Sequence, residues 1–461
     1  MNIPAKLTPF SQSILRPALA SSLSRLASEQ APSSPTPSDI TQPQAVNAFL
    51  AELVLATWGG SEPDVGQLLG VAPPSVTRKG KPGQGMKRAQ TALQDFSGAY
   101  TRLRRWSEWV FESEWSQAQL LQVMEEIEPK VAEALNWVHV LALTAVGSYQ
   151  HLGTLLAKKE KDPARAGALR LGLVAGLETP DSRFLHGLVV GKPVAELRER
   201  FGHMPLAQEG EVALPRVMDA PEELLATPPV DVWNWDVGRG QKRRGEAEKQ
   251  ALSQAGMLGR SGVRKAIDLT QQALVAHAQA REALAYVLAA ARHWALAAAQ
   301  EGADDGRIHH PDEIFMLEIE EIKQMMTGEW HSRAHVDILI QERRKAYEAS
   351  SVDETVHDRP LGVAGYDTEG LLHPFQSPSD LTPDAPPGFM ALATGWHPGW
   401  WRVILKAEGV IDRGGHLLSW LASVARSGDL PALIGGASYA DWPSGVRIRL
   451  NPARNRAETE D

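Results

Sequence analysis

The sequence of 461 residues contains no cysteine, which excludes disulfide bonds, thiolate metal ligands and cysteine nucleophiles. Basic residues are outnumbered, since 47 Lys and Arg stand against 56 Asp and Glu and the formal net charge is −9. A generally basic surface for binding nucleic acid is therefore not expected. The short basic runs at 78–81 and 242–244 are interpreted as solvated faces of loops.

The chain also lacks an apolar run long enough to span a bilayer, and its first residues carry Pro4 instead of the apolar stretch of a signal peptide. We therefore expect a cytoplasmic protein without a membrane partner. The loop at 80–85 contains glycines and a lysine. Pro82 and the absence of a Gly-Lys-Ser/Thr sequence argue against a phosphate-binding P-loop there.

The most informative stretch lies near the C-terminal end. Gly414 and Gly415 form a tight turn before a short amphipathic helix that Ser419 opens, and a buried strand follows at 432–434. Free backbone N–H groups and the helix dipole converge at such a helix start and favour an anion. The predicted anion site consists of Gly414, Gly415, Ser419 and Arg426.

This segment resembles the swivelling phosphohistidine domain of phosphoenolpyruvate synthase, pyruvate phosphate dikinase and rifampin phosphotransferase. The pattern in that family is roughly G-G-x-x-S-H-A-A-x-V-A-R-E-x-x-x-P-A, and the histidine after the serine carries the phosphoryl group. Ser419 and Arg426 match the pattern, but Trp420 stands at the histidine position and Ser427 replaces the glutamate. An indole has no basic lone pair. The resemblance thus implies that the ordinary phosphohistidine mechanism is absent.

Other segments resemble the same PEP-utilising family in the same order along the chain. Residues 7–15 are similar to its L-T-P-x-x-x-S-L-L, residues 197–216 to its F-x-x-x-x-G-H-R-G-P…E-L-x-x-P-R-W, and residues 309–322 to its D-P-x-D-V-F-x-L-T-x-x-E-L. The family's nucleotide-binding ATP-grasp domain, which would precede the first of these segments, is not found in this sequence. No cofactor is therefore expected here, and ATP and Mg²⁺ would act only through a separate partner chain.

Five residues are candidates for binding a substrate: His203, Glu211, Arg216, Trp233 and Trp235. Glu211 and Arg216 are spaced to orient a polar substrate group, and the alternative is a buried ion pair that holds a loop against the helices. The two tryptophans are either a pocket wall or anchors of an irregular segment. The 14 tryptophans of the chain indicate either packing or a pocket for a large apolar ligand.

A cluster of metal-binding residue types occurs at His309, His310, Asp312 and Glu313. Adjacent residues on a turn seldom converge on one ion without further ligands. No metal site is predicted.

The periodicity of apolar residues predicts a multidomain α + α/β protein, in which a large, mostly helical domain precedes a small domain of short strands and helices. The resemblance implies that this small domain is a swivelling β/β/α domain of the phosphohistidine type. Strands are expected at 389–393, 409–411, 432–434 and 446–450, with a helix over 419–427. The predicted divisions are an N-terminal turn and helix (1–27), a Pro/Ser-rich linker or loop (28–46), a helical substrate-binding-like domain (47–349), a linker (350–386), a swivelling mobile domain (387–451) and a disordered tail (452–461).

Two functions remain open, and with them the question of whether the chain is an enzyme. The first is a non-catalytic relative of the family, a pseudoenzyme that binds a large apolar small molecule or a partner protein. The alternative is the substrate-binding and swivelling subunit of a split phosphotransferase that works with an ATP-grasp protein in trans. In that alternative His416, on the glycine turn four residues before Trp420, would serve as a surrogate nucleophile.

Overall fold

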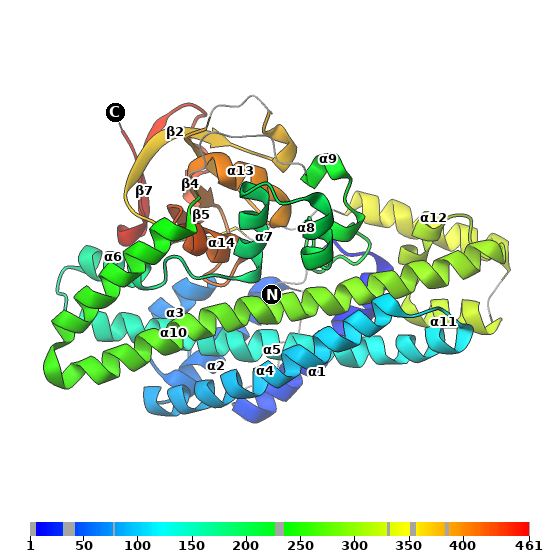
Figure 1. Cartoon of the computed structure of the whole chain (residues 1–461), viewed down its shortest axis with the longest axis horizontal. Coiled ribbons are helices and arrows are strands. Elements are labelled where there is room, and N and C mark those ends of the chain that lie inside the picture. The colour runs from blue at the N-terminus through cyan, green and yellow to red at the C-terminus, as the bar shows by residue number, and fades with distance from the viewer. Residues whose placement is uncertain are drawn as a thin grey trace.

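The structure, a computed structural model, describes residues 6–30, 42–76, 79–225, 235–329, 332–350, 356–382 and 387–460. These residues form a large helical part and a smaller domain built on a β-sheet (Figure 1). The long helices run along the long axis of the molecule, and the sheet domain lies against one side of them. A helical part followed by a small domain with strands is the order that the sequence predicted.

The helical part contains twelve α-helices among the described residues, with short 3₁₀ turns η1 (Val217–Asp219) and η2 (Pro311–Met316) between some of them. Their bounds are α1 (Pro9–Gln30), α2 (Pro43–Trp58), α3 (Glu62–Leu69), α4 (Pro82–Glu112), α5 (Gln117–Ala157), α6 (Pro163–Leu173), α7 (Pro180–Val189), α8 (Val194–Phe201), α9 (Glu222–Leu225), α10 (Val237–Asp304), α11 (Ile319–Thr327) and α12 (Arg333–Ala349).

The longest helix, α10, packs along both α5 and α4 (Figure 1). Small side chains on its buried face let the neighbouring helices approach closely. The buried alanines include Ala273, Ala276, Ala280, Ala283, Ala290 and Ala291. The helix changes direction at Gly256, whose φ of 65° suits glycine.

Helix α5 begins with a capping box at Ser116. The backbone N–H of Gln119 donates to Oγ of Ser116, and the backbone N–H of Ser116 donates to Oε1 of Gln119. Among the described helices, α5 is long and apolar enough to cross a membrane by length and composition alone. Within the protein, however, 78% of its most apolar window is buried, as in the core helix of a globular protein.

The sheet domain contains seven strands among the described residues, in the order β1-β5-β4-β3-β2-β6-β7. The four central strands, β5, β4, β3 and β2, pair in parallel with one another. At the edges, β1 pairs antiparallel with β5, β6 with β2, and β7 with β6. The bounds are β1 (Asp358–Ala364), β2 (Thr368–Pro374), β3 (Phe389–Ala393), β4 (Ala407–Asp412), β5 (Ala432–Gly436), β6 (Arg447–Asn451) and β7 (Arg456–Thr459), with α13 (Trp401–Lys406), α14 (Trp420–Gly428) and the 3₁₀ turn η6 (Pro452–Arg454) between strands.

The strands expected at 389–393, 409–411, 432–434 and 446–450 are confirmed. Two other predictions are wrong. The segment 350–386, expected as a linker, contains β1 and β2, and the tail 452–461, expected to be disordered, contains β7. The physical reason is strand pairing. Strands β5 and β6 would be left as unpaired edges without β1 and β7, and these partner strands supply their hydrogen bonds. The predicted linker 28–46 is also shorter at both ends, because α1 continues to Gln30 and α2 begins at Pro43.

The two faces of the sheet pack differently because neighbouring residues in a strand point to opposite sides. Ala391 and Val410 belong to an apolar core that continues into the helical part. Met390 and Ile411, one position along, belong to a separate small core on the other face. The sheet domain is therefore joined to the helices through a shared core.

The end of α14 offers a test of this docking. A Cβ atom added at Gly428 would lie 1.9 Å from Cδ1 of Trp235. We expect Gly428→Ala to push the indole away and to lower the free energy of unfolding by about 1–3 kcal/mol, measured by urea denaturation.

Gly245→Ala in α10 is the matched control, because no atom lies within 4 Å of the added Cβ. It should leave stability unchanged or raise it by up to about 1 kcal/mol. Equal effects of the two substitutions would contradict the close contact between Gly428 and Trp235.

Candidate functional site

The start of α14 docks against the helical part. Trp420 is the first residue of this helix and is only 5% exposed. The carboxylate of Asp181, in the first turn of α7, lies beside the indole N–H of Trp420, which favours the ionised form of Asp181. The side chain at the predicted phosphohistidine position is thus part of a buried contact between two helices.

Asp181 belongs to a group of side chains that we call the docking network, formed by Asp181, Glu209, Arg281 and Trp420. Arg281 of α10 has its NH1 3.6 Å from Oδ2 of Asp181 and donates from Nε to Glu209 at 3.3 Å. Burial raises the pKa of Asp181 to about 6, although the positive charge of Arg281 opposes the shift. Asp181 therefore titrates close to neutral pH.

His416 lies in the same region but is 7% exposed. Its Nδ1 accepts a hydrogen bond from the backbone N–H of Leu418 at 3.2 Å. Burial lowers the pKa of His416 to about 3. The buried His277 of α10 lies close to His416. At neutral pH His416 is an uncharged ring enclosed by the docked domain.

The groups of the predicted anion site make hydrogen bonds within their own segment. The N–H of Gly414 donates to Oδ1 of Asp412 at 3.0 Å, and Oγ of Ser419 accepts from the backbone N–H of Ala422 at 3.3 Å. Ser419 thus caps α14 as the sequence predicted.

Gly415 and Arg426, the other two members of the predicted anion site, are also held by contacts within their own segment. Gly415 has a φ of 78°, and an added Cβ would lie 2.5 Å from Oδ2 of Asp412, so this turn requires glycine. Arg426 is 4% exposed and donates from NH1 to the carbonyl oxygen of Leu417 at 2.8 Å. No carboxylate of the described residues lies within ion-pair distance of Arg426, and burial lowers its pKa to about 10.

Glu211 and Arg216 lie away from α14, at the beginning of α1. Glu211 is fully buried and accepts hydrogen bonds from the N–H of Thr8 at 2.6 Å and from Oγ of Ser11 at 2.6 Å. Arg216 is also fully buried, and its NH2 lies 3.4 Å from the carbonyl oxygen of Glu211. In this position the two residues hold the loop at 205–216 against the start of α1.

The remaining candidates are separated from one another. Trp235 is 3% exposed and donates from Nε1 to the carbonyl oxygen of Val424 at 2.9 Å, so it anchors α14 to the helical part. Trp233 lies outside the described residues. His203 follows α8 and stacks on Tyr286 of α10. The four described candidates therefore do not form one site, although His203 lies near enough to Arg216 for that charge to lower the pKa of His203 together with burial.

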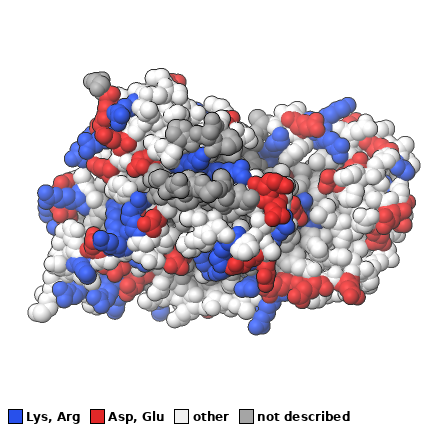
Figure 2. Space-filling model, turned by 45° about the horizontal axis from the view of Figure 1, so that its top comes forward, with Lys and Arg blue, Asp and Glu red and all other residues white. Residues whose placement is uncertain are grey.

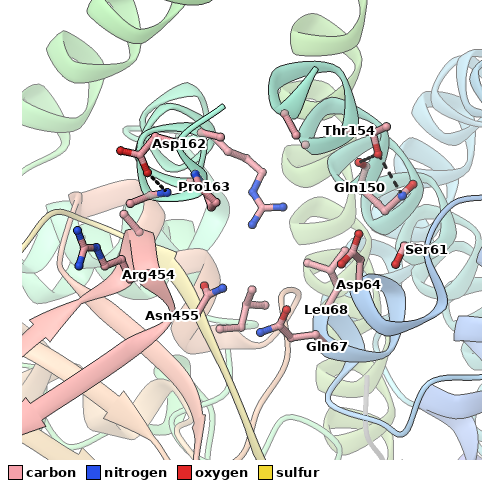
Figure 3. Close-up of a pocket in the computed structure, with 18 of the residues that line it drawn as sticks. Ser61, Asp64, Gln67, Leu68, Gln150, Thr154, Asp162, Pro163, Arg454 and Asn455 are labelled. Carbon is pink, nitrogen blue, oxygen red and sulfur yellow. Dashed lines mark hydrogen bonds between the residues drawn. The ribbon is translucent and has the colours of Figure 1, made fainter. Parts of the chain in front are cut away.

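A large cleft among the described residues lies between the helical part and the sheet domain, and we call it the interdomain cleft. Its volume is about 1110 Å³. Figure 3 shows its walls: α3 and α5 on one side, the start of α6 on another, and the turn after β6 on the third. The polar side chains in view include Ser61, Gln67, Gln150, Thr154, Arg454 and Asn455.

The interdomain cleft was not predicted from the sequence, because its residues come from distant segments and share no motif. Four basic side chains line it against two acidic ones, and its lining includes no aromatic residue. The charged residues are Lys158, Lys161, Arg170, Arg454, Asp64 and Asp162. Basic side chains are also more frequent at this end of the molecule in Figure 2, whereas acidic ones are more frequent at the opposite end.

Arg170 of α6 is one of the basic residues that line the interdomain cleft. Its guanidinium lies 4.8 Å from the centre of the Tyr149 ring, and its Nε has no hydrogen-bond partner within the described part of the chain. None of the described carboxylates forms an ion pair with Arg170. The cleft therefore presents positive charge suited to an anionic ligand. Within the same described ranges, no group of three or more His, Asp or Glu side chains is placed to hold a metal ion.

No protein-family model matches the sequence, and no curated protein matches it either. The resemblance to the PEP-utilising family therefore rests on the sequence segments alone.

The docking network gives a prediction about pH. The pKa of Asp181 in the folded protein, about 6, lies above the ordinary value of 3.8, so the folded state holds this proton more tightly than the unfolded state does. The stability that this contributes is present at low pH and is lost as the pH rises through about 6. Asp181→Asn should therefore gain stability relative to the natural protein between pH 4 and 7, by on the order of 2–3 kcal/mol.

Urea denaturation at each pH measures this difference, and Asp268→Asn, an exposed change on α10, is the control. A difference between Asp181→Asn and the natural protein that stays constant from pH 4 to 7 would rule out the burial of an ionisable group at this position.

Proposed function

We propose that this chain is a non-catalytic relative of the PEP-utilising swivelling-domain proteins and that it binds a small molecule without carrying a phosphoryl group. The observation that carries the proposal is Trp420. It stands at the position of the family's histidine, it is 5% exposed, and its indole lies against Asp181. An indole nitrogen has no lone pair with which to attack a phosphoryl group.

The contacts around α14 support a docked rather than a travelling domain. The N–H of Gly176 donates to the carbonyl oxygen of Arg426 at 2.8 Å, and the N–H of Leu417 donates to the carbonyl oxygen of Leu68 at 2.9 Å. Trp235 adds the bond to Val424. A swivelling motion like that of the family would have to break these bonds and expose the buried charges of the docking network, which is costly.

The interdomain cleft is the proposed binding site. Its volume of about 1110 Å³ is that of a site for a small molecule, and its basic, non-aromatic lining favours a polar anion. Such a ligand fits better than the large apolar molecule that the tryptophan content suggested. Trp58, Trp294 and Trp401 are instead at most 2% exposed and pack in the core. A ligand in this cleft would touch both parts of the protein and would stabilise their contact.

The alternative function, a split phosphotransferase, would require His416 to move. His416 would have to leave its buried position and lose the bond from Leu418 before it could meet a separate ATP-grasp chain. Displacements of this size are poorly tolerated by transfer chemistry.

Mass spectrometry of the intact protein distinguishes the two functions. After incubation with ATP, Mg²⁺ and an extract of the source cells, we expect no adduct of one phosphoryl group, because no nucleophile is exposed at α14. An adduct that maps to His416 and disappears in His416→Asn would establish the split phosphotransferase and overturn our proposal.

Binding is tested by a thermal-shift panel of nucleotides, sugar phosphates and polycarboxylates, followed by calorimetry on any anion that raises the melting temperature. We expect Arg170→Gln and Arg454→Gln each to weaken binding about tenfold, since each removes a charge from the cleft. Lys159→Gln, an exposed change beside the cleft, should leave binding unchanged. A panel without any binder, or a binder unaffected by both arginine substitutions, would contradict the proposed site.

A further inference from the structure

Helix α10 turns back on itself at Gly256, and we call the segment 249–265 around this turn the hairpin tip. Gly256 has a φ of 65° and a ψ of 177°, a conformation that ends one helical arm before the next begins. Figure 1 shows the turn at the opposite end of the molecule from α12. No residue of the hairpin tip lines the interdomain cleft.

The inner side of the hairpin tip is fixed by a small apolar core. Its buried members include Leu156 of α5 and four residues of the two arms, Ala251, Ala255, Val263 and Ile267. Two hydrogen bonds also join the arms. Nε of Arg260 donates to the carbonyl oxygen of Leu252 at 3.4 Å, and Nε2 of Gln271 donates to Oε1 of Glu248 at 2.9 Å. The shape of the turn is therefore set from the inside.

Two large apolar side chains stand uncovered at the apex of the turn. Met257 is 92% exposed and Leu258 is 100% exposed, whereas the next most exposed large apolar residue that the structure describes, Ile338, is 57% exposed. A Cβ atom added at Gly256 or Gly262 would meet no described atom within 4 Å, so the space around the apex is open. Single exposed apolar side chains are ordinary, but a consecutive pair at a protruding apex indicates a contact surface.

The same segment is strongly basic. The stretch 249–265 contains no Asp or Glu and four exposed basic residues, Lys249, Arg260, Arg264 and Lys265. This local excess of positive charge stands out in a chain whose formal net charge is −9. The ion pairs of α10 in the described part of the chain are made by other basic residues, namely Arg243, Arg281 and Arg292.

Helical spacing places the apolar and basic side chains together on the second arm. Arg260 and Arg264 follow Met257 by three and seven positions, and such residues share one face of a helix. Lys265 follows Leu258 by seven positions. The buried residues of this arm point the other way, into the small core. The outer face therefore has an apolar apex with cationic side chains behind it.

We propose that the hairpin tip docks on the surface of an anionic lipid bilayer. Met257 and Leu258 enter the boundary between head groups and acyl chains, and the four basic side chains lie against the negatively charged head groups. The expectation of no membrane partner rests on the lack of a spanning run, and a surface contact needs none. The proposal involves neither Trp420 nor the interdomain cleft, so it stands or fails separately from the proposed function.

Charge and shape favour a bilayer over other occupants of the tip. A second copy of the chain docked tip to tip would bring like charges together. Nucleic acid would pair with the basic side chains but would leave the apolar apex without a partner. An acidic protein would need a cavity shaped for a protruding apex, whereas the fluid boundary of a bilayer admits it without one.

Flotation of the full chain with phospholipid vesicles tests the contact. We expect the protein to float with vesicles of phosphatidylcholine that contain phosphatidylserine, and not with phosphatidylcholine alone. Raising the salt concentration should release it, because the attraction is screened. The double substitution Met257→Ser with Leu258→Ser should weaken the partition about tenfold. Ile338→Ser, an exposed apolar residue on α12, is the control and should have no effect.

A second pair of variants tests the charges. Arg264→Gln with Lys265→Gln should weaken the partition about thirtyfold, since each basic side chain near an anionic surface contributes about fivefold. Arg344→Gln with Lys345→Gln, an exposed basic pair on α12, is the matched control and should leave it unchanged. All of these positions are at the surface, and circular dichroism checks that each variant folds.

Several results would overturn the proposal. These are no flotation with either kind of vesicle, equal flotation with both, and flotation that neither double substitution at the tip reduces. Sedimentation that reveals a dimer lost in Met257→Ser with Leu258→Ser would assign the apex to a second copy. Binding to duplex DNA that is tighter than binding to vesicles and unaffected by that double substitution would assign the basic side chains to nucleic acid.

Discussion

Burial of charged side chains along α10 is the constraint on which the centre of this structure depends. Arg281 is 8% exposed and Glu282 is 10% exposed, and an unpaired charge at such a depth costs several kcal/mol. Each is met by residues from other elements. Asp181 of α7 and Glu209 lie against Arg281, and the hydroxyl of Tyr100 on α4 donates to Glu282. Charge pairing, and not apolar packing alone, therefore places α4 and α7 relative to α10.

The same constraint reaches the sheet domain. Asp181, held by Arg281, is the residue against which Trp420 packs. A domain that carries phosphoryl groups between partners needs the start of this helix to be accessible, yet the first residue of α14 is buried in a contact between domains. Under the proposed function, the absence of a histidine at this position and the docking of the indole are consistent with each other, since a stable contact stands where a carrier would have a mobile reactive end. This is why we favour a binding protein over a carrier.

The interdomain cleft follows from this arrangement. It has walls from α3, α5 and α6 and from the sheet domain, so it exists only while the domain is docked. A ligand bound there would therefore report on docking.

Sequence alone determined the features that depend on neighbours along the chain. Ser419 caps its helix as predicted, the glycine turn at 414–415 forms, and the four strands expected in the C-terminal domain are present. The errors concern β1, β2 and β7, whose short polar segments become strands only because distant strands supply their hydrogen bonds. Patterns within a segment contain no information about such partners.

The candidate site divides in the same way. The resemblance around Trp420 is a prediction from the sequence alone, because it depends only on residues within one segment. The role of Glu211 could not, since its partners Thr8 and Ser11 lie about two hundred residues away in the chain. Nor could the contacts of Asp181 with Arg281, because no motif contains both. The sequence by itself determined which side chains can ionise; only the tertiary structure decided which of them are buried together, because desolvation and pairing depend on distances that exist only in the folded chain.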